Sequence, residues 1–213
     1  MAAATATPRN APRTLAPGSS RVTGLVLAAG GSKRLGQPKQ LLPYGSGLLL
    51  DHVLDTAREC EFGQLLCVLG GGSDEIRERV DLDGVEIVEN VHFGEGCSSS
   101  IAAALTAVDR RSEVLVLMLG DQPGVSAATI AALLDGRGSA PLAACGYADG
   151  RGHPLAFTRS TFSELAVLHG DRGVWKLLDG AGDDVVDVPI PGPAPLDVDT
   201  WEDYRAVLAA GSA

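Results

Sequence analysis

Two patterns of apolar residues alternate along the chain. Short continuous apolar runs predict buried strands, and runs with an apolar residue at every third or fourth position predict helices packed on a sheet. The predicted strands cover residues 22–27, 65–69, 85–88, 114–119, 142–147, 155–158 and 185–188. The predicted helices cover 48–59, 73–80, 99–108, 126–134, 173–178 and 200–209, and a further helix opens at 161. This order predicts one α/β domain with three layers, α/β/α, and a mostly parallel Rossmann-like sheet.

Polar residues at the ends of these runs predict where helices begin. Ser73 and Ser126 each precede an apolar periodic run and are expected as N-caps. Thr161 with Glu164 has the spacing of a capping box, and Thr200 with the acidic residues that follow opens the last helix.

Composition divides the chain into a tail and a domain. Residues 1–21 are rich in Ala, Thr, Pro and Ser and hold little to bury, so we expect a disordered tail followed by one domain over 22–210. Aromatic residues are only 4% of the 213, so the core must be aliphatic. No apolar run approaches the roughly 20 residues that cross a bilayer, and no membrane partner is expected.

Charge is unevenly distributed. The net charge is −10, but residues 1–50 contain no Asp or Glu and six basic residues. An acidic protein is a poor nucleic-acid binder, whereas a basic loop within it favours a small anionic ligand.

The four cysteines form no C-x-x-C pair, which argues against a structural zinc site. Without an apolar segment of the secretory type, a reducing cytoplasm is the expected location. The acid-free start also has features of an organelle transit peptide, but its prolines would interrupt an amphipathic helix. Cys97, beside a glycine loop, is expected to be an inert small side chain rather than a reactive thiol.

The loop after the first strand carries the strongest chemical signal. Small residues at 28–32 let backbone N–H groups approach an anion, and Lys33, Arg34 and Lys39 add positive charge, as in a phosphate cradle. Gln37-Pro38 stands where a Walker A motif has Lys-Ser/Thr, and G-x-G-x-x-G does not occur. The alternative is an ordinary glycine-rich turn with solvated basic residues. A second glycine-bearing strand end, 120–123, should lie at the same edge of the sheet.

The pattern L-A-A-G-x-S-x-R-x-G-x-x-K, from Leu27 to Lys39, resembles the signature of the MobA-like nucleotidyltransferases. Its Ala-Ala-Gly form is similar to the cytidylyltransferase branch, with Leu35 where Met or Phe is usual. Further similar segments follow in the expected order: 94–100, 120–123, 152–154, 170–173 and 197–204, the last with Trp201 in place of Pro. The resemblance implies a sheet of the nucleotidyltransferase type and covers about residues 22–210.

The family's reaction is attack of an acceptor phosphate on the α-phosphorus of an NTP, with release of pyrophosphate. The resemblance implies catalytic roles for Lys39 at the α-phosphate, Arg34 at the β- and γ-phosphates and Asp121 at a metal. The nucleotide-binding residues it implies are Leu27, Ala28, Ala29, Gly30, Gly31, Ser32, Arg34, Lys39, Gly70, Ser98, Ser99 and Asp121.

Mg²⁺ is the implied cofactor, because a small hard cation prefers carboxylate, phosphate and water oxygens. Asp121 and Asp197 are its expected ligands. Asp199 lies two residues further on and would point the same way in an extended segment, so it is also a possible ligand, with helix capping as the alternative.

The acceptor residues that the resemblance implies are Gln122, His153, Pro154 and Gly173. The expected partners are CTP, or GTP or another NTP, and molybdopterin or another phosphorylated small molecule, with a molybdoenzyme or its chaperone as a further partner. Two alternatives stay open. One is a non-catalytic nucleotide- or cofactor-binding accessory protein, and the other is an NAD-dependent oxidoreductase, which would need the dinucleotide fingerprint that the loop lacks.

Overall fold

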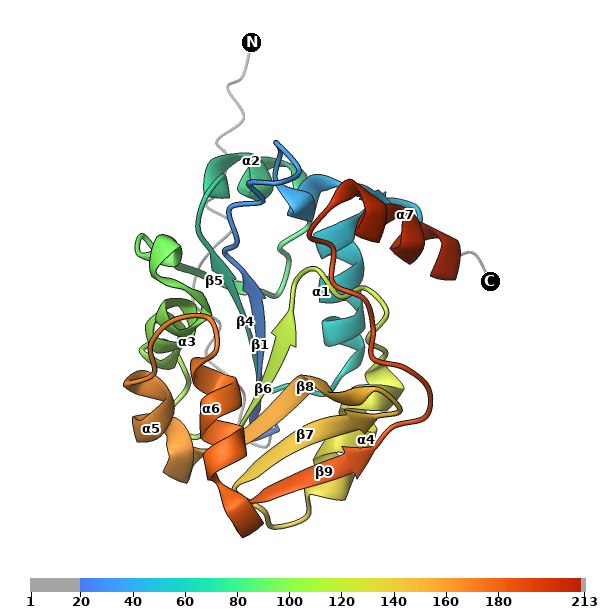
Figure 1. Cartoon of the computed structure of the whole chain (residues 1–213). Helices are drawn as coiled ribbons and strands as arrows, with labels where there is room; N and C mark the ends of the chain where they lie inside the picture. Colours follow the sequence, from blue (N-terminus) through green and yellow to red (C-terminus); the bar gives the residue numbers. More distant parts are fainter. Residues whose placement is uncertain (1–19, 212–213) are drawn as a thin grey trace.

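The computed structural model describes residues 20–211, so the predicted tail lies almost entirely outside the described residues. Seven strands form the central sheet, in the order β5-β4-β1-β6-β8-β7-β9 (Figure 1). The strands are β1 (Val22–Ala28), β4 (Gln64–Leu69), β5 (Glu86–Glu89), β6 (Val114–Leu119), β7 (Leu142–Tyr147), β8 (Gly150–Thr158) and β9 (Val185–Pro189). Only β8 runs antiparallel to its neighbours, β6 and β7, so the predicted mostly parallel sheet is confirmed.

The helices are α1 (Leu49–Glu59), α2 (Ser73–Arg79), α3 (Cys97–Leu105), α4 (Ala127–Arg137), α5 (Phe162–Ala166), α6 (Gly173–Gly180) and α7 (Trp201–Ala210). A short hairpin, β2 (Pro43–Tyr44) with β3 (Gly47–Leu48), leads into α1 and was not predicted. Four single-turn 3-10 helices complete the described part: η1 (Lys39–Leu41), η2 (Phe93–Glu95), η3 (Arg159–Thr161) and η4 (Gly182–Asp184).

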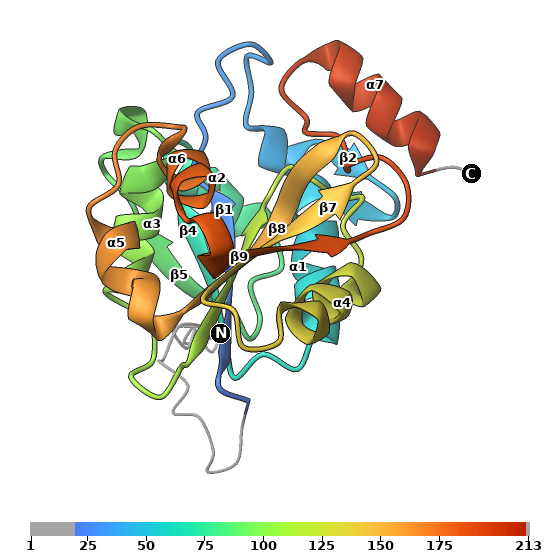
Figure 2. The same ribbon diagram turned by 60° about the horizontal axis from the view of Figure 1, so that its bottom comes forward.

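Helices cover both faces of the sheet. Figures 1 and 2 show α1 and α4 on one side and α3, α5 and α6 on the other. Successive side chains of β1 point to opposite faces, so Val26 packs with α1 and α4, and Leu25 packs with α3 and α6. The core is aliphatic as expected, with Phe157 the largest fully buried side chain.

Three local expectations at helix starts were wrong. Ser73 is already helical, and Gly72 caps α2 with a φ of 77°, a conformation that glycine adopts freely. Thr161 is no capping box, because its hydroxyl donates to the Thr158 carbonyl. Helix α3 begins two residues early, because the Asp171 carboxylate accepts from the Cys97 N–H at 3.0 Å.

The predicted caps of α4 and α7 are present. Ser126 Oγ accepts from the Thr129 N–H at 3.1 Å, and Thr200 forms a reciprocal capping box with Asp203. Replacing Thr200 by alanine is expected to lower the free energy of unfolding by ~0.5–2 kcal/mol, because the α7 N-terminus loses its acceptor. Urea unfolding measures the loss, with Ser163→Ala, an exposed helical serine, as the control. An unchanged midpoint in Thr200→Ala would show that the cap adds nothing.

The described residues hold neither a disulfide nor a helix that could span a membrane. All four cysteines are free thiols, and Cys67 and Cys145 are buried. None of the helices within 20–211 combines the length and apolar character that crossing a bilayer requires.

Candidate active site

A cavity of about 530 Å³ opens at the carboxyl ends of β1 and β6. From β1 the chain builds the sheet outward through β4 and β5, and it then returns to place β6 on the other side of β1. Ligands bind parallel α/β sheets at such points, because the loops leaving the two strands diverge and leave a crevice. The two glycine-bearing strand ends predicted to meet, 28–36 and 120–123, both contribute lining residues.

A buried glutamine fixes the loop after β1. Gln40 is 1% exposed, and its Nε2 donates to the carbonyls of Ala28 at 2.5 Å and Gly30 at 3.3 Å. Further along, Ser32 Oγ accepts from the Lys39 N–H at 2.9 Å and closes the loop on itself. Carbonyls held inward by Gln40 leave this backbone free to present N–H groups to an anion.

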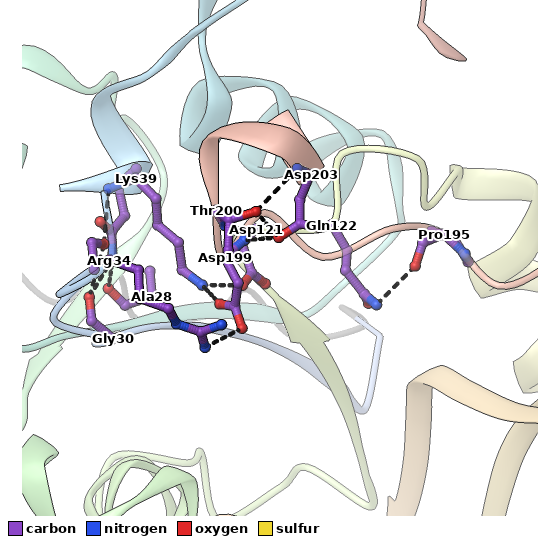
Figure 3. A network of polar contacts seen from close by, with 12 residues as sticks. Ala28, Gly30, Arg34, Lys39, Asp121, Gln122, Pro195, Asp199, Thr200 and Asp203 are labelled. Atoms are coloured by element: carbon purple, nitrogen blue, oxygen red, sulfur yellow. Dashed lines mark hydrogen bonds and ion pairs between the residues drawn. The ribbon is translucent and has the colours of Figure 1, made fainter. Parts of the chain in front are cut away.

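Lys39 lies between two carboxylates at the floor of the cavity. Its Nζ contacts Asp121 and donates to Asp199 Oδ1 at 2.9 Å, and the Lys39 and Asp121 side chains are only 13% and 14% exposed (Figure 3). Burial alone would lower the pKa of Lys39, but the two carboxylates raise it above its ordinary value, so Lys39 is charged. Burial raises the pKa of Asp121, and the ammonium of Lys39 opposes that rise.

The segment before α7 brings two further carboxylates to the cavity. Val198 is fully buried and anchors the segment, and Asp197 and Asp199 on either side of it both line the cavity. Burial and the neighbouring Asp121 charge raise the pKa of Asp197 to about 6. Hydrogen bonding from Lys39 lowers the pKa of Asp199.

Asp121 and Asp197, the predicted metal ligands, thus lie close enough for the charge of Asp121 to affect Asp197. Asp199 is paired with Lys39. Within residues 20–211, no three His, Cys, Asp or Glu side chains are grouped closely enough to enclose an ion by themselves. The donor set fits a hard divalent cation that takes its remaining oxygens from phosphate and water, as Mg²⁺ does.

The other predicted nucleotide residues divide into two sets. Leu27, Ala28, Ala29 and Gly30 line the cavity with Lys39 and Asp121, whereas Gly31, Ser32, Arg34, Gly70, Ser98 and Ser99 do not. Arg34 is two-thirds exposed and pairs with Asp199 at 3.0 Å.

The serines at the start of α3 point their hydroxyls at the backbone. Ser98 Oγ donates to the Gly170 carbonyl at 2.6 Å, and Ser99 Oγ donates to the Gly96 carbonyl at 2.8 Å. Ser100, the third serine of the run, does line the cavity.

Of the predicted acceptor residues, Gln122 and His153 line the cavity, and Pro154 and Gly173 do not. Gln122 Nε2 donates to the Pro195 carbonyl at 3.2 Å, and its buried Oε1 has no hydrogen-bond partner among the described residues. The His153 ring meets Trp175 edge to face, with centroids 5.3 Å apart.

Sequence reasoning missed several residues of the cavity wall. Trp175 lines the cavity, as do Phe93, Arg151 and Asp171. Cys97 is also there, but burial and the charge of Asp171 raise its pKa to about 11, so the expected inert thiol is supported. Asp171 and Cys97 lie within the similar segments 170–173 and 94–100, and Phe93 and Arg151 directly precede such segments, whereas Trp175 had no comparable signal in the sequence.

His153 gives a prediction on pH. Burial lowers the pKa of His153 from 6.5 to about 4. As the pH falls below 6.5, the imidazole is therefore protonated in the unfolded chain and stays neutral in the folded protein. Stability that is fully present above pH 6.5 is therefore lost as the pH falls toward 4. Between pH 7 and 4.5, the free energy of unfolding of the wild type should fall by ~1–3 kcal/mol more than that of His153→Gln.

Denaturant titrations across that range measure this difference. His169→Gln, which removes an exposed imidazole, serves as the control. Parallel pH profiles for wild type and His153→Gln would contradict the prediction.

Comparison with known proteins adds three relatives and one family. The family model described as MobA-like NTP transferase domain matches residues 24–185. Nicotine blue oxidoreductase of Paenarthrobacter nicotinovorans is 32% identical over 161 residues, 71% of this chain and 78% of that protein. The crystal structure of the Rv0371c homolog from Mycobacterium sp. strain JC1 is 51% identical with a TM-score of 0.85, over 91% of this chain and 98% of that one. Rv0371c of Mycobacterium tuberculosis H37Rv, solved in complex with manganese, is 44% identical with a TM-score of 0.79, over 90% and 100%.

Proposed function

The chain belongs to the MobA-like NTP transferase family, and we propose that it transfers CMP from CTP to the phosphate of molybdopterin. A phosphate oxygen of the acceptor attacks the α-phosphorus, a new P–O bond forms, and the bond to the bridging oxygen breaks to release pyrophosphate. One observation carries this proposal: Lys39 is a buried ammonium held between carboxylates at the end of a glycine loop, where a triphosphate would lie.

Each residue of the site has a task in this reaction. Lys39 offsets the negative charge that develops around the α-phosphorus, and backbone N–H groups of Ala29 and Gly30 bind phosphate oxygens. Arg34 reaches the β- and γ-phosphates once it leaves Asp199, which is a short movement for an exposed side chain.

Asp121 and Asp197 would hold a divalent cation, which supplies charge neutralisation to the leaving pyrophosphate. The manganese complex of the mycobacterial relative supports divalent metal use here, and Mg²⁺ is our proposal for the ion. Gln122 and His153 would orient the acceptor. The buried Oε1 of Gln122 has no partner among the described residues, so it can accept a hydrogen bond from a ligand N–H or O–H.

The test is pyrophosphate release with Mg²⁺ and purified molybdopterin, comparing CTP, GTP, ATP and UTP. Release with CTP alone would support the donor and the acceptor together. Release with GTP alone would move the protein to the guanylyl-transferring branch. No release with any of the four, but tight NTP binding, would favour another phosphorylated acceptor or a non-catalytic accessory protein.

A second candidate function comes from the name of one relative, nicotine blue oxidoreductase. Reduction of a substrate needs a hydride donor, such as NADH or NADPH. Binding of either cofactor, measured by its fluorescence, together with no pyrophosphate release, would favour this redox function. The absence of G-x-G-x-x-G from the loop after β1 counts against it.

A further inference from the structure

Phe93 is a large aromatic side chain left partly in solvent. It is 37% exposed, it sits in η2 at the rim of the cavity, and it lines that cavity together with Lys39 and Asp121. An exposed phenyl ring at this place is therefore available to a ligand rather than used in the core.

The Phe93 side chain lies against a group of glycines. A Cβ added to Gly70 would come within 2.8 Å of Phe93, one added to Gly71 within 3.2 Å, and one added to Gly31 within 3.6 Å. These glycines come from the loops after β1 and β4, so the ring is in contact with the loop that we propose binds the triphosphate. The absence of side chains on all three leaves room for the Phe93 side chain beside the backbone.

Gly31 and Gly70, predicted to bind nucleotide, do not line the cavity themselves, whereas Phe93, which lies beside both, does. A nucleotide with its phosphates on the loop after β1 would meet this ring at the edge of the cavity. The surface that it meets is an aromatic face, and every nucleobase has a face that stacks on one.

We infer that Phe93 is the stacking platform for the base of the nucleoside triphosphate; this inference rests on the proposed function. Stacking is tolerant of base identity, because it uses the π-face and not the hydrogen-bonding edge. Phe93 therefore supplies affinity to all four NTPs, and the choice of base falls to polar groups elsewhere in the cavity.

The experiment is calorimetric titration of the full chain, in buffer with MgCl₂, with CTP, GTP, ATP, UTP and inorganic tripolyphosphate. Tripolyphosphate has the charge of the triphosphate but no base. Phe93→Ala should weaken binding of every NTP that the wild type binds by about 5- to 100-fold and leave tripolyphosphate binding unchanged. Phe93→Tyr should bind as the wild type does, and Phe93→Leu should recover only part of the loss. Val91→Ala, an exposed residue of the same segment that does not line the cavity, is the matched control.

Three results would overturn the inference. Equal NTP affinities for wild type and Phe93→Ala would show that the ring does not stack. Equal losses for NTPs and tripolyphosphate in Phe93→Ala would show that the ring only supports the phosphate loop. A wild type that binds neither NTP nor tripolyphosphate would remove the proposed function and this inference with it, a result distinct from the first two.

Discussion

Lys39→Ala is expected to lower kcat for pyrophosphate release by about 100-fold or more, because losing one well-placed donor to a developing oxyanion has an effect of that size. The ammonium is buried and fixed by Asp121 and Asp199 before any substrate arrives, so it needs little reorganisation when charge develops. The KM for the NTP should change far less than kcat, since an interaction made mainly in the transition state acts on kcat.

Lys176→Ala is the matched control, because Lys176 is an exposed lysine on α6 that does not line the cavity. Circular dichroism should confirm that Lys39→Ala is folded, since the substitution leaves Asp121 without its ammonium partner. A kcat within tenfold of the wild type would remove Lys39 from the chemistry.

Asp121→Asn is expected to abolish the divalent-metal response and to reduce turnover by about 1000-fold, the several kcal/mol that a bound metal contributes to charge stabilisation. The amide keeps the shape of the side chain but carries no charge to bind a cation. Direct Mn²⁺ binding, followed by electron paramagnetic resonance, should weaken in parallel. Asp183→Asn, an exposed carboxylate in η4, controls for the loss of one negative charge.

The same measurement separates the two remaining carboxylates. Asp197→Asn should weaken Mn²⁺ binding more than Asp199→Asn does, because Asp197 makes no ion pair within residues 20–211, whereas Asp199 is paired with both Lys39 and Arg34 in the free protein. An unaltered Mn²⁺ titration in Asp121→Asn would place the metal outside this site.

The parallel strands could be predicted because each is a continuous apolar run buried on both faces, as β4 and β6 are. The first half of β8 could not be predicted. Gly150 to Pro154 has a composition typical of a turn, and it becomes strand only through pairing with β7. Helix α3 begins at Cys97 because of Asp171, a carboxylate 74 positions away, and no local pattern can report such a contact.

The residues of the candidate site likewise include some that could be predicted from the sequence and some that could not. Asp121 was predictable because it closely follows β6, at the edge where parallel strands end, and Lys39 because it closes the motif that resembles the family signature. Trp175 and Arg151 reach the cavity only through the path of the chain after β7, which the sequence does not reveal. Ser98 and Ser99 lie at the predicted position along the chain, but their hydroxyls donate to backbone carbonyls instead of facing the cavity.

The antiparallel direction of β8 has a consequence for how such a protein can diversify. Leu155 pairs with Leu117 and Thr158 with Val114, so the strand begins at the edge where β1 and β6 end and carries Arg151 and His153 into the cavity. The loop that we propose binds the triphosphate follows β1. Arg151 and His153 belong instead to the hairpin of β7 and β8, much further along the sequence. If the hairpin binds the acceptor, as we propose, its mutation is expected to change the acceptor while leaving the loop after β1 intact. Relatives that share the loop can in this way come to work on unrelated molecules.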